Sequence, residues 1–252
     1  MTEQKEIIKV EHLTIGYGES ILLKDISFSV KKGEVFAILG GSGSGKSTII
    51  KHLTGLHKPI SGKIFINGVD IVTADEENLA ELRKDFGILY QSGALFSSLT
   101  IEENIALPLL EYTTFPKETV YSIAKVKLNT VGLGGYEKFM PYELSGGMKK
   151  RAALARALAL NPEILFFDEP SAGLDPINSA KLDSLILKLN NETGVTIVIV
   201  THELESLFSV ADRVIIVDKK CQCILDEGEP QSLKGNSKNE WVRNFLNRKY
   251  LG

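Results

Sequence analysis

The first third of the chain alternates between apolar and polar positions with a period of two, which is typical of half-buried β-strands. Glycine-containing turns at 16–18, 32–33 and 67–68 separate the alternating runs. Strands that keep one polar face are typical of an antiparallel sheet. The pattern predicts strands over residues 7–15, 21–30, 35–39 and 64–67.

Farther along, apolar residues recur every three to four positions, which predicts helices over 46–56, 117–131, 145–160, 178–189 and 203–210. Short, fully apolar runs at 164–167, 196–200 and 214–217 lie between the later helices, as expected for buried parallel strands. The order of elements predicts an α/β fold with an antiparallel region early in the chain and a helical insertion at 91–161. No internal repeat or low-complexity tract interrupts it.

The amino-acid composition is consistent with this predicted α/β fold and limits the classes of partner that the protein can have. The 252 residues are 43% hydrophobic and 24% charged, which is ordinary for a globular protein. The net charge of −3, from 29 basic and 32 acidic residues, gives no electrostatic case for nucleic acid as a partner. The two cysteines, Cys221 and Cys223, match neither a metal site nor a disulfide framework, so we expect inert thiols in a reducing cytosol.

The N-terminal sequence MTEQKEIIKV lacks the basic-then-apolar design of a secretory signal. The longest apolar runs are far shorter than the roughly 20 residues that span a bilayer. We therefore expect a cytoplasmic chain, and any membrane process it serves needs another subunit for the membrane part.

The segment GGSGSGKST follows the predicted strand 35–39 and precedes a predicted helix. Glycines in such a loop let backbone N–H groups and a helix N-terminus point at phosphates, while the lysine supplies a mobile positive charge and the serine hydroxyl a Mg²⁺ ligand. A Gly/Ser-rich connector is the alternative, but the complete motif and its strand–helix context favour a purine nucleoside triphosphate site. The residues are Gly40, Gly41, Ser42, Gly43, Ser44, Gly45, Lys46, Ser47 and Thr48.

The run ILFFDEP supplies acidic residues at the end of a buried strand. Ligands of open α/β sheets bind at the carboxyl ends of strands, which is where this run places Asp168. We expect Asp168 to hold Mg²⁺ and Glu169 to polarise the attacking water. A solvated acidic turn is the alternative.

The run LSGGMKKR opens a predicted helix with a serine, two glycines and three cations. Cations in a first helical turn oppose the helix dipole. An anion held at this helix start would explain the pattern.

LSGGM, the strand LFFDEP, SAGLDP and THE occur in an order that resembles the ATP-binding cassette (ABC) ATPases over nearly the whole chain. The resemblance implies a P-loop NTPase fold of the ABC ATPase type, with a RecA-like mixed or parallel sheet core, an N-terminal antiparallel β subdomain and an inserted α-helical subdomain. It implies one cassette over 1–252, with the core in 1–90 and 162–236, the helical subdomain in 91–161 and a helical tail in 237–252.

The same resemblance assigns roles to residues that have weak signals of their own. Tyr17 matches the aromatic residue that stacks on adenine, although a surface aromatic at a strand end is the alternative. Gln91 matches the glutamine that reaches the Mg²⁺ and the water. His202 matches the switch histidine facing the γ-phosphate, and Asp175 matches the loop that couples the two sites across a dimer.

In this family the signature helix of one subunit covers the ATP bound by the other. Ser145, Gly146 and Gly147 would thus offer a hydroxyl and backbone N–H groups to the partner's γ-phosphate. Lys149–Arg151 would add to an anion-attracting edge or form a solvated face, two alternatives that remain open. Met148 stands where many family members have glutamine, and this change leaves the serine and glycine contacts intact.

Three segments resemble the ATPase of Mla-type, MCE-associated phospholipid transporters. They are GALFSSLTIEENIALPL, the signature LSGGM with the helix that follows it, and DEPSAGLDPI. This resemblance implies ATP and Mg²⁺ as cofactors, a second copy as partner, integral permease subunits with an MCE-domain protein, and a place on the cytoplasmic face of the inner membrane. The alternatives are transport of another solute such as an amino acid or a solvent, a non-transport ABC protein acting on ribosomes or DNA, and a regulatory ATP-binding module.

Two apolar segments remain without a role in this scheme. Apolar side chains at 94–96, 99 and 101 either receive the permease or pack under the helical subdomain. In the tail, Trp241, Val242, Phe245 and Leu246 form one helix face, for which packing on its own domain is preferred. The alternative is docking on a second ATPase or a small regulatory subunit.

Overall fold

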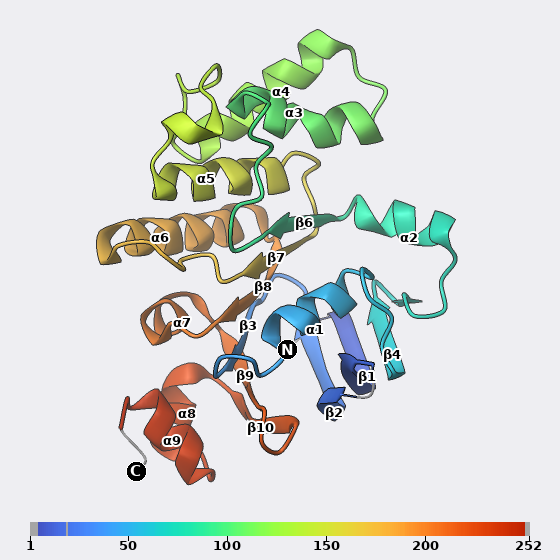
Figure 1. Ribbon diagram of the computed structural model, residues 1–252, viewed down its shortest axis with the longest axis vertical. Helices are drawn as coiled ribbons and strands as arrows, with labels where there is room; N and C mark the ends of the chain where they lie inside the picture. The colour runs from blue at the N-terminus through green and yellow to red at the C-terminus, as the bar shows by residue number, and fades with distance from the viewer. Residues whose placement is uncertain (1–4, 19, 250–252) are drawn as a thin grey trace.

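The computed structural model describes residues 5–18 and 20–249, and within them the strands form two sheets (Figure 1). The larger sheet contains β3 (Val35–Gly40), β6 (Phe86–Leu89), β7 (Ile164–Asp168), β8 (Thr196–Thr201), β9 (Arg213–Asp218) and β10 (Cys223–Gly228). The smaller contains β1 (Glu6–Tyr17), β2 (Ser20–Lys31), β4 (Ser61–Ile66) and β5 (Val69–Asp70).

The order of the larger sheet is β10-β9-β3-β8-β7-β6, and all its neighbours are parallel except β10 on β9. The carboxyl ends of β3, β8, β7 and β6 therefore meet at one edge. Every residue of β3 and β8 is buried, which explains their uninterrupted apolar sequences. The smaller sheet has the order β2-β1-β4-β5 and is antiparallel, as the alternating pattern predicted for 7–15, 21–30 and 64–67. The run at 35–39 instead forms β3, which lies between parallel neighbours in the larger sheet.

Helices cover both faces of the larger sheet and extend beyond one end of it, where α3, α4 and α5 stack beyond α6 (Figure 1). Their bounds are α1 (Lys46–Leu53), α2 (Glu76–Arg83), α3 (Ile101–Tyr112), α4 (Lys117–Thr130), α5 (Gly146–Ala157), α6 (Pro176–Thr193), α7 (Leu204–Val210), α8 (Pro230–Asn236) and α9 (Glu240–Leu246). These elements confirm the predicted α/β class, with an antiparallel sheet early in the chain and helices inserted after β6. The residue boundaries assigned to the subdomains stay a prediction.

The apolar periodicity of the sequence did not predict helix α3. Apolar residues lie around most of this helix, so they do not recur on one face only. Its start nevertheless carries a recognisable signal: Thr100 and Glu103 form a capping box, in which each side chain bonds the other's backbone. Ile101 is fully buried, so this residue packs inside the protein and is no part of an exposed apolar patch.

Alternate side chains of the larger sheet enter different parts of the core. Phe36 and Phe166 point to the face covered by α1 and the smaller sheet. Leu165 and Phe167 point to the face covered by α5 and α6. Leu39 belongs to a third cluster, which packs beneath β3 and β9 against α7, α8 and α9.

The C-terminal helix α9 is part of this third cluster. Val242 and Leu246 are 0% and 1% exposed, and the rings of Trp241 and Phe245 stack beside them with centroids 4.9 Å apart. The apolar face of the tail therefore packs on its own domain, which confirms the preferred interpretation.

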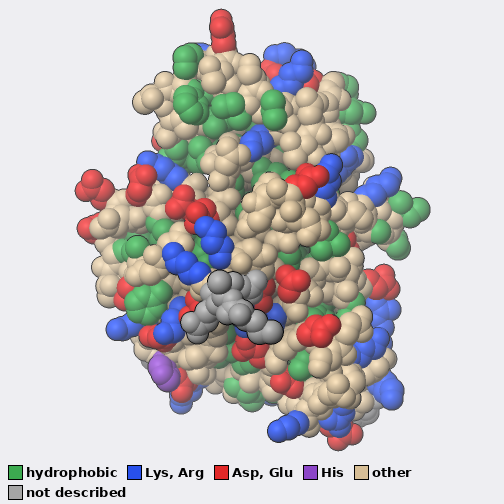
Figure 2. Space-filling view, turned by 180° about the vertical axis from the view of Figure 1, so that it is seen from behind, with side chains coloured by type: hydrophobic (Ala, Val, Ile, Leu, Met, Phe, Trp, Pro, Cys, Tyr) green, Lys and Arg blue, Asp and Glu red, His purple; other side chains and the backbone are tan. Residues whose placement is uncertain are grey.

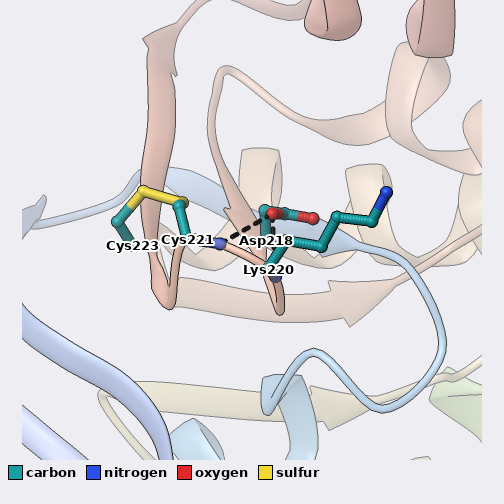
Figure 3. The surroundings of a disulfide bond; sticks show 4 residues. All are labelled: Asp218, Lys220, Cys221 and Cys223. Carbon is teal, nitrogen blue, oxygen red and sulfur yellow. Dashed lines mark hydrogen bonds between the residues drawn. A yellow bond between two sulfur atoms is a disulfide. The ribbon is translucent and has the colours of Figure 1, made fainter.

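The prediction of two free thiols is wrong: Cys221, in the turn after β9, forms a disulfide with Cys223, the first residue of β10 (Figure 3). In an extended strand their Cα atoms would be about 6.6 Å apart, near the upper end of the range found in disulfides. Gln222 has a φ of +57°, and this turn brings the Cα atoms to 5.3 Å. Asp218 accepts hydrogen bonds from the N–H groups of Lys220 and Cys221 and so holds the turn.

The surface carries charges of both signs, interspersed over the face seen in Figure 2, whereas hydrophobic side chains gather toward the end formed by α3–α5. In the part of the chain that the structure describes, none of the helices combines the length and the apolarity required to cross a bilayer.

Candidate functional site

The loop that joins β3 to α1 forms a close-fitting cradle. A Cβ on Gly40 would lie 2.6 Å from the hydroxyl oxygen of Ser44 and equally close to a carbonyl oxygen of β9, so only glycine fits there. Gly45 precedes α1 with a φ of +95°, a conformation that favours glycine. The Lys46 ammonium folds back and donates to the carbonyls of Gly40 and Gly41 at 2.9 and 3.0 Å.

Several donors of the cradle lack a protein partner, which is the condition for binding an anion. The Ser44 hydroxyl is buried and makes no hydrogen bond. Gly45 offers no side chain to cap α1, so the first-turn N–H groups at Lys46–Thr48 have no intrahelical acceptor. A ligand with several negatively charged oxygens, such as a nucleotide polyphosphate, fits this set of donors.

The loop also carries Ser42 and Gly43, the latter with a φ of +72°. Tyr17, at the end of β1, is half exposed and its hydroxyl lies 3.3 Å from that of Thr48. The tyrosine side chain therefore lies beside the cradle and is open to solvent over half of its surface. This placement agrees with the predicted adenine stack, which stays a prediction.

The two acidic residues at the end of β7 lie directly against the cradle. Ser47 donates from its hydroxyl to Asp168 Oδ1 at 2.7 Å. Glu169 is 7% exposed, and its Oε1 lies 3.8 Å from the Lys46 ammonium. Burial lowers the pKa of Lys46, and the nearby charges of Glu169 and Asp168 oppose this effect.

Glu169 has a φ of +50°, an unfavourable backbone conformation for a residue with a side chain. Such strain persists only where surrounding contacts impose it, and it concentrates at functional sites. Here it turns the carboxylate toward His202, whose Nδ1 lies 2.7 Å from Oε2 without the alignment of a hydrogen bond. The histidine follows β8 and is largely exposed on its other side.

Gln91 follows β6 and completes the row of four neighbouring strand ends. It lines an open hollow of about 560 Å³ together with Tyr90, Ser92, Asp168, Ala172 and Gly173. The parallel order of β3, β8, β7 and β6 thus brings together segments separated by more than 160 residues of sequence. Binding at the carboxyl ends of strands is the usual arrangement in open α/β sheets.

The residues predicted to hold a metal ion supply oxygen atoms of different kinds: the Ser47 hydroxyl, the Asp168 carboxylate and the Gln91 amide. Hard oxygen ligands with few protein carboxylates suit Mg²⁺, which takes its remaining ligands from phosphates and water. Within residues 5–18 and 20–249 there is no cluster of three or more histidine, cysteine or acidic side chains able to hold a metal by itself.

The signature residues form a second group at the start of α5. Ser145 caps this helix by accepting from the Met148 N–H at 3.3 Å, and Ser145 and Gly146 are exposed. Asp175 caps the neighbouring helix α6 and is bonded to Asn178, which lies beside Gly147. Across the described residues, no hydrogen bond or ion pair joins Ser145–Gly147 or Asp175 to the cradle at 40–48.

Two of the three cations after Met148 bind main-chain carbonyl groups, and only the first of these two is buried. Lys150 is buried, and its ammonium donates to the carbonyls of Gln91 and Glu169. Arg151 donates to the carbonyls of Val131 and Gly132 after α4. Periodicity places Lys150 on the buried side of α5, but the sequence contains no signal for the two carbonyl groups that it meets.

Comparison with known proteins agrees with this geometry. The family model described as ABC transporter matches residues 23–172. The chain is 42% identical over 97% of its length to a probable ribonucleotide transport ATP-binding protein, mkl, of Mycobacterium leprae, of which it covers 70%. It is 40% identical over 95% of its length to the intermembrane phospholipid transport system ATP-binding protein MlaF of Escherichia coli, of which it covers 88%.

Solved structures show the same fold. The dimeric, post-hydrolysis structure of the ATP-binding cassette MJ0796 with ADP and Pi is 33% identical with a TM-score of 0.80, over 88% of this chain and 98% of that one. The structure of cbiO1 from Clostridium perfringens, part of the ABC transporter complex cbiONQ, is 30% identical with a TM-score of 0.84, over 98% of this chain and 96% of that one. The chain therefore belongs to the ABC transporter family, and it is an ATP-hydrolysing cassette of that family.

Proposed function

We propose that this cassette powers a transporter that moves phospholipid between the inner and outer membranes, as a pair of copies that enclose two Mg·ATP. One observation supports ATP hydrolysis above all: five side chains lie together at one edge of the larger sheet. They are Lys46, Ser47, Asp168, Glu169 and His202. The likeness to MlaF supports the lipid substrate.

The chain's own side chains divide the work of hydrolysis. Lys46 and the N–H groups of the cradle bind the phosphates. Glu169 accepts the proton of the attacking water, and its burial beside Lys46 keeps the carboxylate in one position. His202 orients that carboxylate and faces the γ-phosphate.

Ser47, Asp168 and Gln91 would hold Mg²⁺, which neutralises negative charge on the phosphates as the reaction proceeds. The existing hydrogen bond between Ser47 and Asp168 already places two of these ligands side by side.

The exposed signature supports a dimer in which each site takes Ser145, Gly146 and Gly147 from the other copy. These residues lack contact with their own cradle within the described chain, and the related cassette MJ0796 is dimeric. Asp175, beside the signature, would couple the two sites.

An apolar groove of about 400 Å³ would receive a cytoplasmic helix of an integral permease subunit. Phe86, Ala94, Phe96, Pro108 and Tyr112 line it, and Phe96 is half exposed. Its lining residues include Tyr90 directly before Gln91 and Ala94 shortly after it, so a helix seated there would act on the ATP site. An MCE-domain lipid-binding protein and a small regulatory subunit complete the proposed complex on the cytoplasmic face of the inner membrane.

Ribonucleotide transport is a second candidate, because mkl, at 42% identity, is named for it. Purification of the complex from membranes, followed by mass spectrometry of bound lipid and nucleotide, separates the two. We expect glycerophospholipid to co-purify and to stimulate ATP hydrolysis. Stimulation by ribonucleotides other than ATP, with no bound lipid, would support the second candidate instead.

Two substitutions test the proposed ATPase site. Glu169→Gln should lower the hydrolysis rate by about 100-fold or more while ATP still induces a dimer, because only the proton acceptor is lost.

Ser145→Arg should retain ATP binding but abolish both dimerisation and hydrolysis. Steady-state hydrolysis, binding of a fluorescent ATP analogue and light scattering measure these outcomes. Normal turnover in either variant would overturn the assignment of that residue.

A further inference from the structure

One buried ammonium group joins the signature helix to two loops of the ATP site. Lys150, in the second turn of α5, is 7% exposed. Its Nζ donates to the main-chain carbonyl of Gln91, after β6, and to that of Glu169, after β7, at 3.3 Å. The three segments are far apart in the sequence, and Lys150 touches both residues expected to act on the attacking water.

The environment of Lys150 suits a bridge between main-chain oxygens. Burial lowers the pKa of this lysine, while the negative charges of Glu169, Glu203 and Asp168 favour its charged form. An ammonium is a compact charge with three rotatable donors, so it can satisfy two carbonyls that arrive from different directions.

The carbonyl of Glu169 belongs to a strained residue. Its φ of +50° is held on one side by the N–H bond to the Val200 carbonyl at 2.9 Å. On the other side, the Glu169 carbonyl accepts from the Ala172 N–H at 3.2 Å and from Lys150, which is the one of the two donors that belongs to α5. These contacts fix the peptide groups that flank the Glu169 side chain, and with them the direction of the carboxylate.

A second cation of α5 reinforces the attachment on the Gln91 side only. Arg156 donates to the carbonyls of Gly93 and Ala94 at 3.0 and 2.7 Å. Helix α5, which begins after Ser145, therefore binds the segment after β6 through both Lys150 and Arg156. It binds the segment after β7 through Lys150 alone.

We propose that Lys150 is a positioning residue that couples the signature helix to the Gln91 and Glu169 loops of the same subunit. When Ser145–Gly147 engage the partner's γ-phosphate, α5 shifts, and Lys150 transmits the shift to the backbone that aims the Glu169 carboxylate. Each copy then completes its own site only while it also covers the other copy's ATP. This inference rests on the proposed dimeric ATPase.

The test compares Lys150→Met with Arg151→Met in the full chain. Both variants remove a cation of α5 that binds two main-chain carbonyls, but the acceptors of Arg151 lie after α4, away from the ATP site. Lys150→Met should lower kcat by about 10–100-fold, the cost of a small misplacement of a catalytic group, with ATP affinity changed less than about twofold. Arg151→Met should lower the melting temperature with kcat retained, and Lys150→Arg should recover part of the lost kcat.

Combination with Glu169→Gln shows whether Lys150 acts through the carboxylate. If it does, Lys150→Met in the Glu169→Gln background causes no further loss of kcat. Equal kcat losses in Lys150→Met and Arg151→Met, or additive losses in the double variant, would overturn the proposal. Lys150→Gln, which keeps an amide donor, replaces the methionine variant if the latter does not fold.

Different results would contradict the catalytic role of Glu169 and the positioning role of Lys150. If Glu169→Gln itself hydrolyses ATP at the normal rate, the proposed catalytic role of Glu169 is wrong. If Glu169→Gln is inactive but Lys150→Met is not impaired, only the positioning role of Lys150 is wrong.

Discussion

A buried carboxylate lies beneath the loop that follows Glu169. Asp183, on α6, is 6% exposed and accepts a hydrogen bond from the Ser206 hydroxyl of α7 at 2.9 Å. The Ser206 oxygen also lies 3.4 Å from the hydroxyl of Ser171. Asp183 therefore links α6 and α7 to the segment between Glu169 and Asp175.

Burial is the main cause that raises the pKa of Asp183 above 3.8, and Glu203 adds to it, while the Ser206 hydrogen bond opposes the shift. A raised folded-state pKa means that the folded protein binds this proton more tightly than the unfolded chain. The associated stability is fully present below about pH 3.8 and is lost as the pH rises through the folded pKa.

Asp183→Asn should therefore raise the free energy of unfolding at neutral pH, because the amide accepts the Ser206 bond without a buried charge. The gain should shrink as the pH falls, because the wild-type carboxyl group takes up a proton more readily in the folded protein than in the unfolded chain. Urea unfolding of both proteins from pH 4 to 8 measures this difference. A difference independent of pH, or a more stable wild type at neutral pH, would contradict it.

At the level of elements, β6 and α5 approach each other closely, and this contact sets the position of the Gln91 loop. A Cβ on Gly87 would lie 2.3 Å from the carbonyl oxygen of Ala157 and 2.6 Å from a Leu165 methyl group. Because the nearest atom belongs to the backbone, a methyl group at Gly87 can be accommodated only if the helix and strand separate.

Gly87→Ala should accordingly lower the free energy of unfolding by about 1–3 kcal/mol or more, the usual cost of overpacking. Gly235→Ala is the matched control, because this glycine of α8 has no atom within 4 Å of an added Cβ. A helical alanine there should stabilise the protein by about 0.5–1 kcal/mol. Denaturant unfolding compares the two, and equal effects would show that close packing of β6 on α5 is unimportant.

At the level of the whole molecule, α9 closes the core beneath β3 and β9. The helix buries Val242 and Leu246 completely against the cluster that contains Leu39 of β3, the strand leading into the cradle. The C-terminal segment therefore supports the sheet that positions the ATP site.

Deletion of residues 239–252 should lower the free energy of unfolding by about 3–6 kcal/mol, from the exposure of two large buried side chains and their neighbours. Leu246→Ala, which keeps the chain length, should lose about 2–5 kcal/mol. Calorimetry and denaturant unfolding measure both. Unchanged stability of the truncated chain would show that the helix does not serve the fold and would revive its interpretation as a docking segment.

The sequence alone determined the α/β class, the phosphate cradle and the acidic strand end, because each depends on local signals: periodicity, glycine spacing and an apolar strand before Asp168. It also determined the family, through the order of its motifs. Only the tertiary structure decided which residues that are far apart in the sequence come into contact. The parallel order of β3, β8, β7 and β6 brings His202 to Glu169, and the turn at Gln222 pairs Cys221 with Cys223.

The three cations after Met148 show the physical reason for this division. Charge and spacing in LSGGMKKR predicted an anion at the helix start, and that role for Ser145–Gly147 remains a prediction. Lys150 instead donates to two carbonyl groups in the loops after β6 and β7. Every residue carries a carbonyl group, so no residue type marks which of them a distant side chain will meet. Only the packing of α5 against β6 and β7 selects those two.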